Sequence, residues 1–133
     1  MRVLIVEPLP PRTEWPRGIF RSRWVPMGPA YMGRALLRAG HQVRIHCSEE
    51  QVIKASGARQ AGDPGEAAGA RDVADAALRR DMEEFRPDMV GLSLTTPAVP
   101  TGEEVARMAK ELSGGRTLVV VGGPHPRRCP SVP

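Results

Sequence analysis

Two short apolar runs in this chain end in residues that could contact a ligand. The first run, DMVGLSLTTP, places Ser93, Thr95 and Thr96 after apolar residues, and the second, VVVGGPHP, ends in Gly122 and Gly123. Short apolar runs of this kind predict buried parallel strands, and ligands of open α/β sheets bind at the carboxyl ends of such strands. Hydroxyl groups there can bond to a ribose or a phosphate, and glycines let a ligand approach the backbone closely.

The two strand ends are related by a defined spacing. Ser93-x-Thr95 is followed by 26 residues (96–121) and then by Gly122-Gly123. This pattern resembles the second half of the signature of cobalamin (vitamin B12)-binding domains, in which Ser-x-Leu or Ser-x-Thr precedes Gly-Gly at this distance. The first half of that signature, Asp-x-His-x-x-Gly after the first strand, is absent. A cobalamin domain without this histidine resembles the amino-terminal domain of B12-dependent radical SAM enzymes.

Three longer segments carry the same resemblance. Residues 26–41 (PMGPAYMGRALLRAGH) are similar to the PPLGLAYLAAVL…AGH segment of those domains. Residues 85–91 (FRPDMVG) are similar to their FRPDVVGIS run, and residues 120–126 match their VVGGPHP run. The likeness covers residues 1–126 and fails in the Pro/Arg-containing tail, 127–133. We therefore expect one cobalamin-binding domain over 1–126, incomplete at its carboxyl end, followed by an unstructured tail.

The resemblance implies cobalamin held base-off, with no protein ligand on cobalt and with its nucleotide tail inserted between the sheet and the helices. Gly122 and Gly123 would then form a narrow wall of the channel for this tail. Glu7 and Pro8, at the mouth of the first strand, would lie beneath the corrin. The residues predicted to bind the cofactor are Glu7, Pro8, Ser93, Leu94, Thr95, Thr96, Gly122, Gly123, Pro124 and His125.

The positions of the three histidines argue against ligation of cobalt. His41 and His46 lie at the two ends of the predicted second strand, and His125 follows the glycine pair. None of them lies in the loop after the first strand, where an axial ligand would have to be, so we predict no metal ligand from the protein. Trp15 and Trp24 either close over the corrin or form a small cluster under a long loop.

Strand-like and helix-like segments alternate along the chain, which predicts a parallel sheet with right-handed crossovers. The expected fold is α/β: a flavodoxin-like (Rossmann-like) three-layer sheet with strand order 2-1-3-4. The expected strands are 2–6, 42–47, 89–93 and 117–121. Four helices are expected. The first buries Met32, Ala35, Leu36 and Ala39, and the second is a short helix over 49–55. The third covers 72–85 and buries Ala74, Leu78, Met82 and Phe85, and the fourth begins with a capping box at Thr101–Glu104.

The predicted sheet lacks a fifth strand. Residues 124–133 contain four prolines, and proline cannot donate to a ladder of hydrogen bonds, so this tail cannot form a central strand. The fourth strand is then an open edge, which is a liability for a soluble monomer. We therefore expect either a longer enzyme, whose radical SAM domain or chain is the partner, or self-association through this edge.

Composition excludes several other classes. The chain has 133 residues, of which 41% are hydrophobic and 26% charged, as in one ordinary globular domain. No apolar run approaches the length of a membrane span, and the first strand does not resemble a signal peptide, so we expect a cytoplasmic protein. The net charge is +4, but basic and acidic residues are interspersed without a basic stripe, which argues against nucleic-acid binding.

The cysteines limit what the chain can do alone. Cys47 and Cys129 are its two cysteines, and they form no CxxxCxxC motif. In the family that the chain resembles, that motif holds a 4Fe-4S cluster to which S-adenosylmethionine binds. Both would have to come from a missing or separate domain, so we expect no catalysis from this chain by itself.

Other functions stay open from the sequence. MRVLIV together with ALLRAGH also suggests the amino-terminal half of a GT-B glycosyltransferase, although the early glycine-rich loop and its histidine are missing. A receiver module would need an aspartate at the end of the third strand, where this chain has Ser93. A dinucleotide-binding domain would need glycines after the first strand, and residues 7–12 contain none. A non-catalytic interaction module also remains. The preferred prediction is a cobalamin module that serves as methyl or radical carrier for a radical SAM methyltransferase-type enzyme.

Overall fold

The computed structural model describes residues 1–9, 27–55 and 66–123. Its centre is a parallel sheet of four strands in the order β2-β1-β3-β4. This confirms the predicted α/β, flavodoxin-like fold and its strand order. The strands are β1 (Arg2–Glu7), β2 (Gln42–Cys47), β3 (Met89–Ser93) and β4 (Leu118–Gly122), and the helices are α1 (Met27–Arg38), α2 (Ser48–Ala55), α3 (Glu66–Phe85), the short 3-10 helix η2 (Thr96–Ala98) and α4 (Val99–Ser113).

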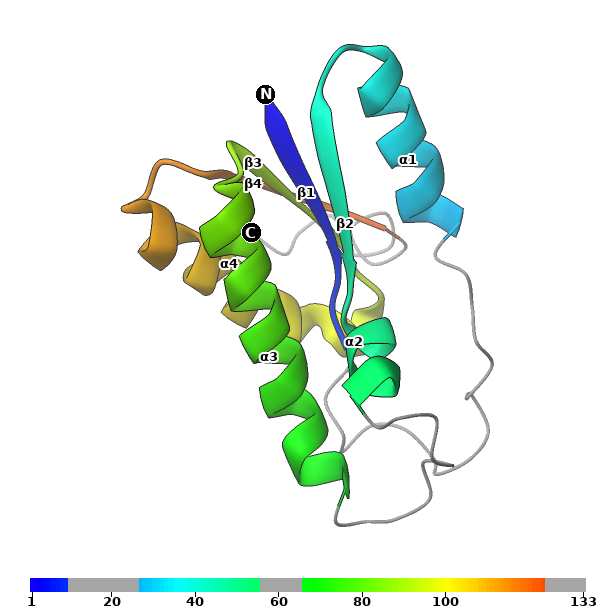
Figure 1. Cartoon of the computed structure of the whole chain (residues 1–133), viewed down its shortest axis with the longest axis vertical. Helices are drawn as coiled ribbons and strands as arrows, with labels where there is room; N and C mark the ends of the chain where they lie inside the picture. Colours follow the sequence, from blue (N-terminus) through cyan, green and yellow to red (C-terminus); the bar gives the residue numbers. More distant parts are fainter. Residues whose placement is uncertain (10–26, 56–65, 124–133) are drawn as a thin grey trace.

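The sheet separates two unequal layers of helices, with α1 on one side and α3 and α4 on the other (Figure 1). Side chains of alternate residues in a strand point to opposite faces, and the strand register therefore assigns every position to a layer. The face toward α3 and α4 holds the main apolar core. Its buried members are Leu4, Val6, Leu78, Met82, Val90, Leu92, Leu94, Ala98, Val105 and Ala109.

The opposite face is only half covered. Helix α1 contacts β2 and β1, and beneath it Val3 and Ile5 are buried. On the same face β4 presents Leu118, which is 53% exposed, and Val120, which is 44% exposed. The part of this face formed by β3 and β4 is therefore an apolar surface that no described helix covers.

The buried side of α1 differs from the prediction. The residues that α1 buries are Pro29 and Gly33, whereas Met32 is 55% exposed and Ala35 and Ala39 are exposed as well. A Cβ built on Gly33 would lie 3.1 Å from Cδ1 of Ile45. The helix is turned so that its glycine faces β2, because only a residue without a side chain permits this close packing.

Helices α3 and α4 both begin earlier in the chain than predicted. The predicted capping box at Thr101 is wrong, because α4 begins two residues earlier at Val99 and its N-cap, Ala98, makes no side-chain hydrogen bond. Thr101 is instead buried. The helix predicted over 72–85 is longer and begins at Glu66, although Ala74, Leu78 and Met82 are buried on it as expected.

Helix α3 ends in an unusual backbone conformation. Arg86 has φ +47° and is the one non-glycine residue with a positive φ in the described part of the chain. Helices α1 and α4 are followed instead by glycines in this region, Gly40 and Gly114. Left-handed conformation costs an L-residue about 1–2 kcal/mol, and glycine avoids this cost.

We therefore expect Arg86→Gly to stabilise the domain by about 0.5–1 kcal/mol, since the greater freedom of unfolded glycine offsets part of the gain. Urea unfolding followed by circular dichroism measures this difference. The matched control is Arg79→Gly in the interior of α3, which should destabilise the domain by about 1 kcal/mol. A loss of stability in the Arg86 variant would contradict the strain argument.

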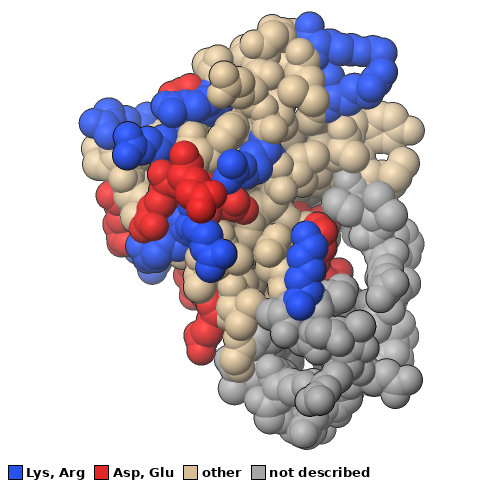
Figure 2. Space-filling view, in the orientation of Figure 1, with Lys and Arg blue, Asp and Glu red and all other residues tan. Residues whose placement is uncertain are grey.

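Charges of both signs are mixed on one face of the molecule. Lys and Arg side chains are interspersed with Asp and Glu side chains on the face seen in Figure 2, over the helices on the left of the view. Of the helices that the structure describes, none combines the length and the apolar character needed to cross a bilayer.

Candidate functional site

The predicted site residues of three strands fall into one row. Ser93 pairs with Gly122, and Glu7 pairs with Cys47; continuing the β1–β3 register by one residue places Glu7 beside Ser93. By the alternation of side chains, all four lie on the face that carries α1. The fold therefore brings Glu7, Ser93 and Gly122 together at the carboxyl edge of the sheet, where α/β proteins bind ligands.

Two glycines leave this face open beside the row. A Cβ built on Gly91 would meet no atom within 4 Å, and one built on Gly122 would meet only the carbonyl oxygen of Leu92, at 3.9 Å. Both positions lie on the uncovered part of the sheet, next to Val120. Among the described residues, this part of the face therefore has room above both glycines, and Ser93 lies beside it in the same row.

Gly123 has a different role from Gly122. Its φ is +102°, and an added Cβ would lie 2.5 Å from the carbonyl oxygen and 2.7 Å from the nitrogen of Leu94. The neighbouring backbone bond, in which the Leu94 N–H donates to Gly122 O at 2.8 Å, continues the ladder between β3 and β4. Gly123 is thus required by the fold, whether or not a ligand contacts it.

The other predicted residues are dispersed. Leu94 is 5% exposed and belongs to the core on the α3/α4 side, so only its backbone reaches the edge. Thr95 and Thr96 are exposed where η2 begins, and Pro8 is buried after β1. Pro124, His125, Trp15 and Trp24 lie outside the described residues.

Burial shapes the electrostatics of the row. Partial burial raises the pKa of Glu7, and the nearby carboxylate of Glu49 raises it further. Burial also raises the pKa of the Cys47 thiol, although backbone hydrogen bonds from the start of α2 oppose this change. In both groups burial works against the charged form.

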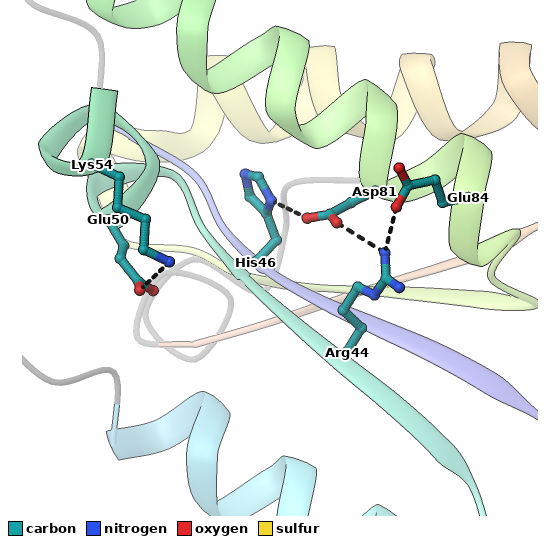
Figure 3. A network of polar contacts seen from close by, with 6 residues as sticks. All are labelled: Arg44, His46, Glu50, Lys54, Asp81 and Glu84. Atoms are coloured by element: carbon teal, nitrogen blue, oxygen red, sulfur yellow. Dashed lines mark hydrogen bonds and ion pairs between the residues drawn. The ribbon is translucent and has the colours of Figure 1, made fainter. Parts of the chain in front are cut away.

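A polar network around one buried histidine lies on the other face of the sheet, and the sequence analysis did not find it (Figure 3). His46 is fully buried, and its Nδ1 donates to Oδ2 of Asp81 at 2.7 Å. Arg44 binds Oδ1 of the same carboxylate at 3.0 Å and lies 3.5 Å from Glu84. Its guanidinium also stacks over Phe85. One signal in the sequence could have indicated this network. Arg44 and His46 are two residues apart on β2 and therefore lie on the same face of the sheet.

This network leaves one polar atom without a partner. Nε2 of His46 is buried and makes no hydrogen bond. His46 shares its face with Val6 and Leu92, opposite to Ser93 and Gly122, and His41 lies near the amino end of β2. Neither histidine is directed toward the row. Within 1–9, 27–55 and 66–123, no group of three or more His, Cys, Asp or Glu side chains is arranged to hold a metal ion.

A cleft of about 700 Å³ lies at the opposite, amino-terminal edge of the sheet, between the ends of α3 and α4. Its polar floor is already bonded, because Thr117 Oγ1 donates to the carbonyl of Pro87 at 2.9 Å and Ser113 Oγ accepts from Thr117 N at 3.1 Å. The predicted residues are not among those that line it. The carboxyl edge remains the candidate site.

Comparison with known families shows which family the chain belongs to. The family model of the B12 binding domain matches residues 18–132. The chain belongs to the B12-binding domain family. This match supports cobalamin as the cofactor of the domain. The match also favours the cobalamin module over the glycosyltransferase alternative.

A curated relative gives a wider context for this B12-binding domain. An uncharacterized methyltransferase of Pyrococcus horikoshii, PH0819, is 27% identical over 125 residues, which are 94% of this chain and 22% of the relative. The chain thus spans about a fifth of the length of the relative that it matches. No solved structure matches the chain.

Proposed function

We propose that this B12-binding domain holds cobalamin base-off, without a protein ligand on cobalt, for a radical SAM methyltransferase-type enzyme. The observation that carries the proposal is the pairing of Ser93 with Gly122 on a face left open at Gly91. A planar base can lie against backbone there without displacing a side chain. The hydroxyl of Ser93 is placed at the edge to bond to the tail of the cofactor.

The positions of the described histidines support the absence of a cobalt ligand. His46 is bonded to Asp81 on the far face, and His41 precedes β2 at the other end of the sheet. The residue at the mouth of β1 is Glu7, a carboxylic acid and not a histidine. This position therefore offers cobalt no imidazole nitrogen.

Bound cobalamin would supply a methyl or radical carrier, and the chain would supply its position. In this division, Gly91 and Gly122 admit the nucleotide tail, and Ser93 orients it. The backbone bond from Leu94 N–H to Gly122 O holds the two strand ends together. The protein's own residues thus bind and orient the cofactor and take no part in proton transfer.

The catalytic partner is proposed from two observations. The chain has two cysteines and no CxxxCxxC motif, so a cluster and S-adenosylmethionine would be held by another domain or chain. The relative named as a methyltransferase is several times longer than the part that this chain matches. A second copy of the chain at the free edge of β4 is a further proposed partner.

Titration with hydroxocobalamin tests the proposal. We expect saturable binding and a shift of the absorption spectrum to that of base-off cobalamin. After reduction to Co(II), electron paramagnetic resonance should show no splitting from an axial nitrogen. Nitrogen splitting would contradict the ligand-free state, and a titration without binding would contradict the whole proposal.

A further inference from the structure

The two edges of the sheet are protected to different degrees. The edge strand β2 carries Arg44, which is engaged with Asp81, and α1 packs over β2. The other edge strand, β4, has no charged residue from Thr117 to Gly123. Natural proteins usually protect an edge strand with charged residues, bulges or a covering element, because its unpaired N–H and C=O groups can bond to a strand of another molecule. In the described structure β4 has none of these.

Both faces of β4 are apolar where they meet solvent. Leu118 and Val120 are exposed on the α1 side, and Val121 is 48% exposed on the side of α3 and α4. A helix or a ligand could cover one of these faces but not both. A strand placed beside β4, with apolar side chains above and below the sheet, would cover both and pair the backbone as well.

The outer hydrogen-bonding groups of β4 are fixed by its bonds to β3. Leu118 N–H donates to Asp88 O at 2.9 Å, and Gly122 O accepts from Leu94 N–H at 2.8 Å. In a parallel ladder, alternate residues bond to the same neighbour. Leu118, Val120 and Gly122 therefore bond toward β3, while the N–H and C=O groups of Val119 and Val121 point outward.

We propose that β4 pairs with β4 of a second copy of this chain, antiparallel and about a two-fold axis at Val120. Val119 of each copy would exchange two backbone hydrogen bonds with Val121 of the other. Val120 would face its own copy as a non-hydrogen-bonded pair, in which side chains lie closest. Leu118 would lie opposite Gly122, a large residue opposite a small one on the same face.

Charge also favours this partner. No charged side chain enters the paired segment, and Arg116 of one copy would lie about 27 Å from Arg116 of the other, eight residues along the strand at about 3.4 Å each. Two-fold pairing is self-complementary and closed, so it gives a dimer with an eight-stranded sheet. A pair of five-residue strands buries less than the roughly 1,200–2,000 Å² of stable interfaces, so the dimer should be weak.

The test is sedimentation velocity of the full chain, without cofactor, over a wide concentration range. We expect a monomer–dimer equilibrium. Val120→Lys and Val120→Glu should each weaken it about tenfold or more, because like charges would lie directly opposite each other. An equimolar mixture of the two variants should dimerise again. Val73→Lys, which removes an exposed valine from α3, is the matched control and should leave the equilibrium unchanged.

Each other outcome overturns the proposal. A monomer at all concentrations would show that the edge does not pair. Species larger than a dimer would show open-ended stacking instead of a closed two-fold contact. A dimer that the Val120 variants do not weaken, or that their mixture does not restore, would place the contact elsewhere. None of these results depends on cobalamin, so they are separable from the titration with hydroxocobalamin.

Discussion

Gly122→Val should weaken cobalamin binding by about 100-fold or more, which corresponds to about 2.7 kcal/mol, while the domain stays folded. The added Cβ has room in the free protein, since its nearest neighbour would be Leu92 O at 3.9 Å, and valine is favoured in strands. In the complex, the same side chain would occupy the space of the nucleotide tail. Titration with hydroxocobalamin and the far-ultraviolet circular dichroism spectrum measure the two quantities.

Three controls sharpen this experiment. Gly69→Val, at an open position near the start of α3, should bind cobalamin normally. Ser93→Ala should cost about one hydrogen bond, on the order of 0.5–1.5 kcal/mol. Gly123→Val should damage the fold itself, because its Cβ would clash with the backbone of Leu94. Parental affinity in a folded Gly122 variant would show that the tail lies elsewhere.

Asp81→Ala should destabilise the domain by about 2–3 kcal/mol, whereas His46→Leu should change its stability by less than about 1 kcal/mol. Loss of the carboxylate removes the hydrogen bond to Nδ1 of His46, so that both nitrogens of the buried imidazole are then without a partner. It also removes the bond to Arg44. Replacement of the imidazole by leucine removes a buried nitrogen that is already unbonded. Asp81, which is 25% exposed, keeps its bond to Arg44.

The double variant tests whether the pair acts as a unit. Once His46 is leucine, the further change Asp81→Ala should cost less than it does in the parent, and chemical denaturation of all four proteins gives the coupling free energy. Glu84→Ala removes the exposed partner of Arg44 and should cost about 0.5 kcal/mol or less. Equal losses in the Asp81 and His46 variants would contradict this account of the network.

The strands and their order could be predicted from local pattern. The segments 42–47 and 89–93 are strands with the predicted bounds. Strand β1 ends one residue later than predicted, and β4 is shifted by one residue at both ends. Runs of β-branched and aliphatic residues between turn residues depend little on what lies far away in the chain. The spacing from Ser93 to Gly122 is likewise local to one β–α–β unit, and the family that it suggested is the one whose model matches the chain.

Helix orientation and the buried network depended on the tertiary structure. The apolar periodicity predicts that Met32 is buried on α1. Gly33 is buried instead, because Ile45 of β2 lies so close to the helix that only glycine fits there. The sequence of the helix alone does not contain this information. His46 and Asp81 are 35 residues apart, so their bond exists only once α3 packs on β2.

The sequence by itself determined which strands form, their order and the residues at their carboxyl ends, because these follow from short apolar runs and parallel crossovers. The tertiary structure decided which face those ends share and how much of it is covered. Glu7, Ser93 and Gly122 become one row only through the register of three strands. The exposed face of β4 likewise follows from where α1 lies, since a helix covers only the strands against which it packs.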